Sequence, residues 1–132
     1  MWLLDSNVCI HLLNARHPEI ERNFRLHSPS EIALCSIVKA ELFFGARHSQ
    51  RVDANLQRLK RFFAPLASLP FDDRCAEEYG LIRKDLTVQG KLIGPNDLLI
   101  AAIARAYDAT LVTHNTREFC RIPAIRMEDW EK

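Results

Sequence analysis

The sequence has few of the features that mark several common protein classes. Its 132 residues contain 4 cysteines, which are widely spaced and form no C-x-x-C pair, so the usual zinc-binding spacings are excluded. These are Cys9, Cys35, Cys75 and Cys120. No apolar segment approaches the ~18 residues of a membrane-spanning helix, and the first residues lack the basic and long apolar regions of a signal peptide. We therefore expect a cytoplasmic protein with reduced thiols.

An excess of charge of one sign is also lacking. The chain has 18 Lys and Arg residues against 17 Asp and Glu residues, so its net charge of +1 identifies no partner. Any nucleic-acid surface must therefore be a local patch. The 48% hydrophobic and 27% charged content is typical of a globular protein. With this length and no repeat or linker, the sequence predicts a single domain over residues 1–132.

Short apolar runs alternate with longer periodic segments along the chain. The runs predict strands at residues 2–4, 32–34, 66–71, 110–113 and 122–127. Apolar spacing predicts helices near residues 8–13, 19–26, 37–44, 52–63, 76–88 and 96–104. The expected helix caps are Ser6 or Asn7, Ser36, and Asp72 or Asp73. This alternation is typical of an α/β domain with a mostly parallel sheet and helices on both faces.

Three carboxylates stand within strongly apolar segments. Asp5 ends the first predicted strand, Glu41 interrupts the helix at 37–44, and Asp97 opens the helix at 96–104. Alone, each has a structural explanation, as a helix cap, an exposed helical residue and a first-turn acid respectively. Together they predict an acidic pocket, because sites in open α/β sheets form beyond the carboxyl ends of the strands. Mg²⁺ or Mn²⁺ is the expected occupant, and such a site suits phosphate chemistry.

Five segments carry a family resemblance: LLDSNVCIHLL, SIVKAELFFGA, IGPNDLLIAAIARA, LVTHNTREF and IPAIRMEDW. In this order, over nearly the whole chain, they resemble the PIN-domain ribonucleases and, more narrowly, the VapC toxins of bacterial toxin–antitoxin modules. The resemblance implies a PIN-like three-layer α/β/α domain with a central, mostly parallel sheet of about four to five strands. It also implies an endoribonuclease that depends on Mg²⁺ or Mn²⁺, forms a homodimer and is neutralised by a VapB-type antitoxin.

The resemblance also assigns site residues. The family's three metal-binding acids correspond to Asp5, Glu41 and Asp97. Ser6 matches the small hydroxyl residue that would orient the first acid or a metal water. Asn115 stands at the family's fourth acidic position and offers a neutral oxygen but no charge, so one bound metal is the expectation. Glu118 could replace the missing charge, although a solvated turn acid is the simpler interpretation.

The resulting hypothesis is hydrolysis of a phosphodiester bond in a tRNA or a ribosomal RNA loop. RNA contact requires local positive charge around the acids. The candidate contacts are Arg47, Arg51, Arg83, Lys91 and His114. Taken singly, each of the basic residues is also explained as part of a solvated helix face. No side chain is an obvious general base, and His114 is interpreted as a structural or substrate-contact residue.

Two other functions remain open. A phosphoryl-accepting aspartate also follows a first strand, but that chemistry needs a second nearby acid and a lysine beyond a later strand. Residues 5–7 and 113–115 provide neither. A PIN-like domain that binds RNA or a protein partner with weak or no cleavage is the stronger alternative, because Asn115 replaces an acid.

Overall fold

The protein is built around one sheet of five parallel strands. The computed structural model describes every residue from Met1 to Lys132. In spatial order the strands are β3 (Ala67–Leu69), β2 (Ile32–Cys35), β1 (Trp2–Leu4), β4 (Thr110–Val112) and β5 (Arg126–Glu128). The chain runs outward from β1 to β3 and then crosses back to β4, so the switch point of the sheet lies between β1 and β4. Ligand sites in open α/β sheets form at such a point, outside the carboxyl ends of the strands.

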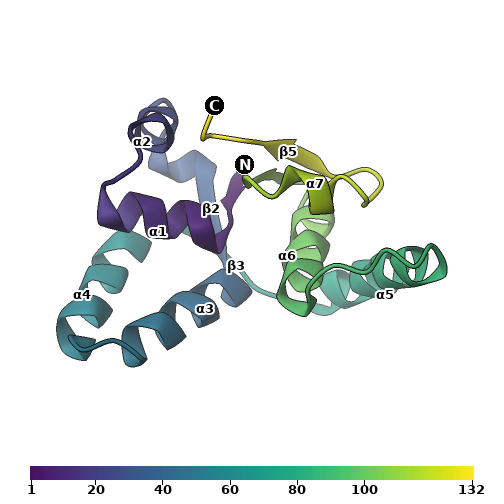
Figure 1. Cartoon of the computed structure of the whole chain (residues 1–132), viewed down its shortest axis with the longest axis horizontal. Coiled ribbons are helices and arrows are strands. Elements are labelled where there is room, and N and C mark those ends of the chain that lie inside the picture. The colour runs from purple at the N-terminus through teal and green to yellow at the C-terminus, as the bar shows by residue number, and fades with distance from the viewer.

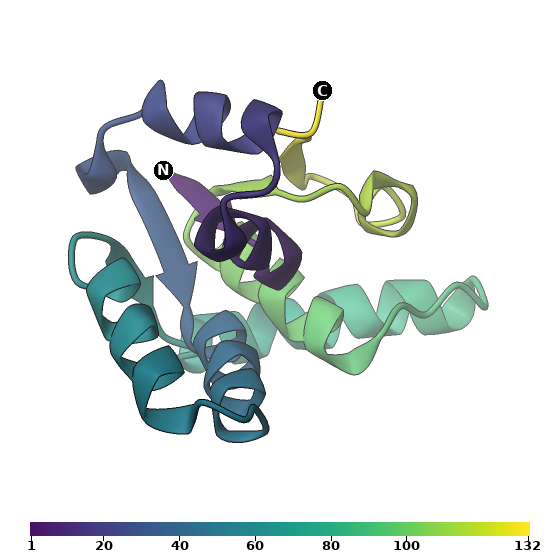
Figure 2. The same cartoon turned by 60° about the vertical axis from the view of Figure 1, so that its left-hand side comes forward.

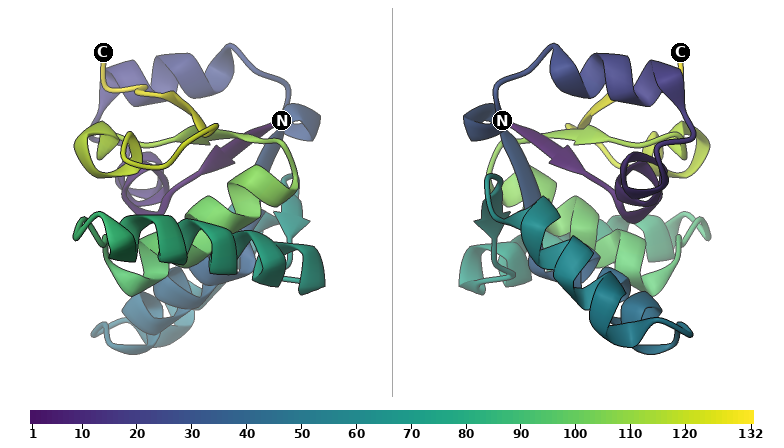
Figure 3. Two further views of the ribbon diagram at one scale, coloured as in Figure 1. Left: turned by 90° about the vertical axis from the view of Figure 1, so that its right-hand side faces the viewer. Right: turned by 90° about the vertical axis from the view of Figure 1, so that its left-hand side faces the viewer.

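Helices cover both faces of this sheet (Figure 1). They are α1 (Ser6–Asn14), α2 (Pro18–Arg25), α3 (Ser36–Arg47), α4 (Val52–Phe63), α5 (Asp73–Val88), α6 (Pro95–Ala106) and α7 (Thr116–Phe119), with one 3₁₀ turn, η1 (Pro29–Glu31). Figure 3 shows α2 on one side of the sheet and α5 and α6 on the other. Helices α3 and α4 lie side by side (Figure 2). The predicted α/β/α arrangement with a parallel sheet is therefore confirmed.

The core lies between the sheet and these helices. Strand β2 is buried at every position from Ile32 to Cys35, as expected for a parallel strand that is covered on both faces. Helix α6 is apolar nearly all round because it packs against α5, α3 and β4. Its rigid placement matters for function, because Asp97 lies in its first turn.

Some predicted boundaries and caps are wrong. Asp5 itself caps α1, whereas Ser6 is already helical, and α3 is preceded by Cys35 without any side-chain cap rather than capped by Ser36. Asp72 caps α5 as predicted, through a bond from the Cys75 backbone N–H.

The last strand also lies later than predicted. It begins at Arg126 rather than at Ile122, because Phe119 at the end of the short helix α7 and Ile122 just after it are buried in the core. Residues 114–116 are polar and lie outside every helix expected from the sequence, yet α7 begins at Thr116. Burial of these two apolar side chains moves the strand toward the end of the chain.

The thiols are as expected from their spacing. All four cysteines are free, with Cys9, Cys35 and Cys75 buried and Cys120 exposed. Burial raises the pKa of the Cys9 thiol well above its usual value and that of Cys35 to about 11. Both thiols beside the acidic site are therefore protonated at neutral pH and have little nucleophilic character. None of the helices is long and apolar enough to cross a membrane.

Candidate active site

Asp5 lies at the switch point of the sheet, where β1 passes into α1. Its backbone N–H donates to the Val112 carbonyl of β4 at 3.1 Å, which extends the pairing of the two strands by one residue. Its carboxylate accepts a bond from the Val8 backbone N–H at 3.0 Å and so caps α1. One carboxylate therefore both begins a helix and faces the carboxyl end of the sheet.

A buried hydroxyl supports Asp5 from the neighbouring strand. Thr113 follows β4 directly and is completely buried. Burial is the main effect that raises the pKa of Asp5, and the charge of Glu41 raises it further. Hydrogen bonding from the Thr113 side chain and from the Val8 backbone opposes the rise. Thr113 is thus part of the site, and the sequence signal for it is a polar residue that ends an apolar strand.

Glu41 reaches the same region from α3. Its Oε1 accepts a bond from the Ser6 hydroxyl at 2.7 Å, which joins α1 to α3. The resemblance had suggested that Ser6 orients Asp5 or a water, but in the structure it orients Glu41. The side chain of Glu41 remains half-buried.

Asp97 completes the trio from the first turn of α6. Pro95 begins the helix, and a Cβ added at Gly94 would lie 3.6 Å from the Asp97 Oδ2 atom. The pKa of Asp97 is raised to about 6, first by burial and then by the negative charges of Glu118, Glu41 and Asp5. The trio predicted from the sequence is thus gathered into one electrostatic cluster, although its members lie far apart in the chain.

Glu118 belongs to the same cluster. Among the charges that raise the pKa of Asp97, that of Glu118 has the largest effect. The Asn115 Nδ2 atom donates to Glu118 Oε2 at 3.1 Å, and the Asn115 backbone N–H donates to Thr113 Oγ1 at 3.0 Å. Asn115 therefore holds Glu118 in place, and the interpretation of Glu118 as a solvated turn acid does not fit its position.

The donor set fits a hard cation in its chemistry. The negative charge of Glu41 raises the pKa of Asp5, and the charges of Glu118, Glu41 and Asp5 raise that of Asp97. A divalent cation prefers oxygen ligands and would neutralise this repulsion. In this arrangement, no three His, Cys, Asp or Glu side chains lie close enough together to hold a metal ion. The structure thus places these acids together without forming a closed ligand shell.

The raised pKa of Asp97 predicts a specific dependence of stability on pH. The folded value of about 6 exceeds the usual 3.8, so ionised Asp97 opposes folding at neutral pH, and this effect is lost progressively as the pH falls from about 6 to 3.8. We expect Asp97→Asn to unfold with a free energy about 1 kcal/mol higher than the unmodified protein near pH 7, after allowance for solvent screening. Urea denaturation across pH would show this gain shrinking toward acid pH. A gain that is constant with pH would contradict the assignment.

The basic residues predicted to contact RNA lie in four different places. Arg47 and Arg51 are exposed around the turn between α3 and α4, and Arg83 is exposed on α5, where it donates to the Tyr79 hydroxyl at 2.8 Å. His114 pairs through Nδ1 with Asp129 at 2.9 Å, which is a structural contact near the end of the chain. Lys91 lines a basic pocket beside α7.

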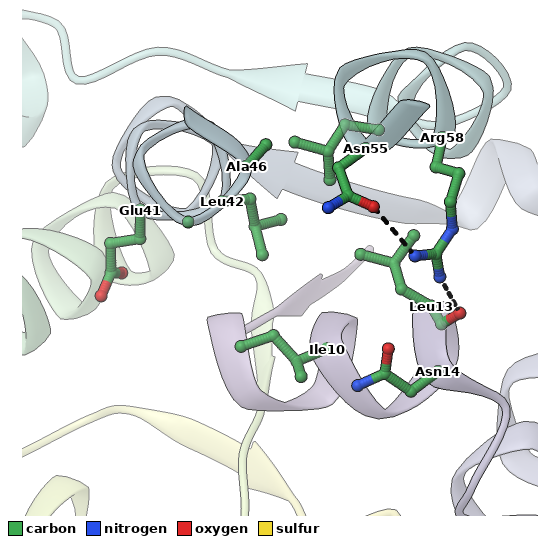
Figure 4. A pocket seen from close by; sticks show the side chains of 10 residues that line it. Ile10, Leu13, Asn14, Glu41, Leu42, Ala46, Asn55 and Arg58 are labelled. Carbon is green, nitrogen blue, oxygen red and sulfur yellow. Dashed lines mark hydrogen bonds between the residues drawn. The ribbon is translucent and has the colours of Figure 1, made fainter. Parts of the chain in front are cut away.

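An apolar cleft opens beside Glu41, between α1, α3 and α4. It has a volume of about 270 Å³, and its apolar walls are Ile10, Leu13, Leu42, Ala46 and Leu59. Figure 4 shows the Glu41 side chain at one edge of this cleft, pointing away from Asn55 and Arg58. Arg58 spans the opposite side and donates to the Leu13 carbonyl of α1 and to Asn55. The cleft therefore reaches the acidic cluster without containing it.

Comparison with known proteins agrees with this architecture. The PIN domain family matches residues 2–125. The chain is 39% identical to "Ribonuclease VapC2" of Rickettsia felis over 100% of this chain and 99% of the relative, and 35% identical to "tRNA(fMet)-specific endonuclease VapC" of Shigella flexneri over 98% and 97%. The crystal structure of VapBC2 from Rickettsia felis bound to a promoter DNA fragment has a chain that superposes with a TM-score of 0.91, at 38% identity, over 98% of each chain. This chain therefore belongs to the PIN-domain family, among the VapC ribonucleases.

Proposed function

We propose that this protein is a divalent-metal-dependent endoribonuclease toxin that cleaves a structured RNA, a tRNA or a ribosomal RNA loop, and is neutralised by a VapB-type antitoxin. The observation that carries the proposal is the cluster of Asp5, Glu41, Asp97 and Glu118 at the switch point of the sheet. A relative named as a tRNA(fMet)-specific endonuclease makes tRNA the first substrate to test. The proposal places the protein in the cytoplasm, where such RNA is found and where cysteines stay reduced, as the four free cysteines would require.

The chain's own residues have distinct parts in this reaction. Asp5, Glu41 and Asp97 would hold Mg²⁺ or Mn²⁺, with Glu118 as a fourth acid in place of the neutral Asn115. When bound there, the cation would supply activation of a water and neutralisation of charge on the phosphate oxygens. Ser6 fixes the rotamer of Glu41 through its 2.7 Å bond, so that carboxylate stays directed toward the site.

Two contacts keep the carboxylate of Asp5 in place. Asp5 is held by the helix cap and by Thr113, so it needs little reorganisation when a cation binds. Asn115 has its amide N–H on Glu118, which leaves its amide oxygen free to face a water or a phosphate. No histidine is paired with these carboxylates, and the reaction is assigned no side-chain general base.

The structure also offers a place for an inhibitory partner. The apolar cleft between α1, α3 and α4 is lined by the exposed side chain of Ile10 and by buried leucines, and it reaches Glu41. A helix of a VapB-type antitoxin that covers these side chains would also cover the acidic cluster. Two solved relatives are described as VapBC complexes, from Rickettsia felis and Salmonella typhimurium. A homodimer, as the family resemblance implies, is part of the same proposal.

The direct test is cleavage of purified tRNA and of total RNA by the purified protein. We expect defined fragments with Mg²⁺ or Mn²⁺ and none with EDTA, and mapping of their ends identifies the target. RNA binding without cleavage under every metal condition would instead favour a PIN-like binding module. Covalent labelling of Asp5 by acetyl phosphate would favour a phosphoryl-accepting protein.

Metal binding has a readout that does not depend on activity. We expect Mn²⁺ to raise the melting temperature, because a cation that binds only the folded state stabilises it, by about 2.7 kcal/mol at a hundredfold excess over its dissociation constant. Glu118→Gln should weaken this gain if Glu118 is the fourth acid, whereas Glu77→Gln, on the exposed face of α5, should leave it unchanged. Differential scanning fluorimetry measures these melting temperatures. An equal gain in the unmodified protein and in both variants would remove Glu118 from the metal site.

A further inference from the structure

A second pocket lies where the loop after α5 meets α7, and three of its five lining residues are basic. The pocket is bounded on one side by the loop Gly90–Leu92, which follows α5. On the other side lie Arg117, which belongs to α7, and Arg121, which follows that helix. Its volume is about 530 Å³, and it is open to solvent. Leu92 is 48% exposed at its edge, so the pocket combines positive charge with one apolar side chain.

The positive charges in this pocket have no acidic partner. None of the ion pairs of the chain involves Lys91, Arg117 or Arg121. Arg121 is anchored by bonds from its Nη1 atom to the carbonyls of Lys91 and Leu92, at 3.5 and 3.4 Å, which fixes its guanidinium against the loop. Three cations gathered in one place without a counter-charge, on a chain of net charge +1, favour an anionic ligand.

Residues of the pocket are close in the sequence to two of the clustered acids. Arg117 directly precedes Glu118 in α7, and Leu92 lies only five residues before Asp97. The acidic cluster alone repels a polyanion, so productive binding of RNA needs positive charge close to it. Arginine suits this purpose, because its planar guanidinium binds two phosphate oxygens at once.

We propose that Lys91, Arg117 and Arg121 form a subsite that binds an RNA backbone phosphate next to the one that is cleaved. This inference rests on the proposed endoribonuclease function and adds Arg117 and Arg121 to the contacts expected from the sequence. Leu92 lies where a sugar or base attached to that phosphate would make apolar contact. The subsite sets the position of the strand, and the carboxylates act on the neighbouring phosphodiester.

The experiment uses the double variant Lys91→Gln/Arg117→Gln. Both side chains are exposed and free of ion pairs, so the fold should be retained, and Arg121 is left intact because it supports the loop. The matched control is Arg16→Gln/Arg25→Gln, which removes the same charge from exposed positions just before α2 and within it. Binding of fluorescein-labelled tRNA is measured in an Asp97→Asn background, which prevents cleavage, as a function of salt concentration.

We expect the pocket variant to weaken tRNA binding about tenfold and to lower the slope of log K against log salt by about 0.7, the value for one lost phosphate contact to a single strand. In proteins that retain Asp97, the KM for tRNA cleavage should rise about tenfold, with kcat within about twofold. The control should change neither the dissociation constant nor the salt slope.

Unchanged RNA affinity and salt slope in the pocket variant would overturn the subsite. The same holds if the variant weakens only the binding of a protein partner, because the pocket would then serve that partner. If the pocket variant loses RNA affinity but the unmodified protein cleaves no RNA, the subsite stands and the proposed endoribonuclease function fails.

Discussion

Asp97→Asn is expected to lower the rate of RNA cleavage by about a thousandfold or more while the protein becomes slightly more stable. The carboxylate lies at the centre of the acidic cluster, where Glu118, Glu41 and Asp5 all act on it. Loss of one carboxylate removes both a cation ligand and the charge that holds the cation, and each 1.4 kcal/mol of lost transition-state stabilisation lowers the rate tenfold. The measurement is the initial rate of tRNA cleavage in Mg²⁺ or Mn²⁺ under single-turnover conditions.

The two expected effects have opposite signs, because the cleavage rate falls while the stability rises. Most substitutions that inactivate a protein by disturbing its fold also lower its stability, whereas removal of a strained functional charge raises it. Asp85→Asn, on the exposed face of α5, is the matched control and should alter neither quantity. Cleavage at the normal rate by Asp97→Asn would show that the cluster is not the catalytic site.

Leu4→Ala is expected to lower the free energy of unfolding by about 2–5 kcal/mol, the range for a leucine truncated in a packed core. Leu4 is completely buried in β1, opposite Val112 of β4, and directly precedes Asp5. Its loss therefore leaves a cavity under the residue that caps α1 and faces the site. Urea denaturation measures the change in stability, and the cleavage rate at a temperature where the variant is folded measures any displacement of Asp5.

Leu81→Ala provides the comparison for this substitution. Leu81 is 57% exposed on α5, so the same truncation there should change stability by no more than about 0.5 kcal/mol. Similar losses at the two positions would mean that β1 is not the packed centre of the fold. A cleavage rate that falls in Leu4→Ala at full folding would show that packing beneath Asp5 positions the carboxylate.

Local rules predicted much of the fold. Pro95 and Asp72 mark helix starts through constraints that act within a few residues, and the apolar run at residues 32–34 is a strand that is buried on both faces. The trio Asp5, Glu41 and Asp97 was singled out from the sequence, because a carboxylate in an apolar segment needs a partner, and its role as a site stays a prediction. These predictions depend on neighbours in the chain, and the sequence contains those neighbours.

The sequence did not predict the contacts between segments that are distant in the chain. The pairing of Ser6 with Glu41 spans 35 residues, and the proximity of Glu118 to Asp97 depends on how α7 returns to α6. The short helix α7 itself forms because Phe119 is buried in the core, and a polar turn pattern gives no sign of that burial.

By itself, the sequence determined the alternation of strands and helices, the parallel sheet and the three acids within apolar segments. The reason is that periodicity, capping and turn chemistry act over short distances along the chain. Only the tertiary structure decided which acid bonds to which hydroxyl, that Glu118 joins the cluster, and that Lys91, Arg117 and Arg121 share a pocket. The reason is that electrostatic effects depend on the distances between groups in space, and those distances are set by packing between elements that are remote in the chain.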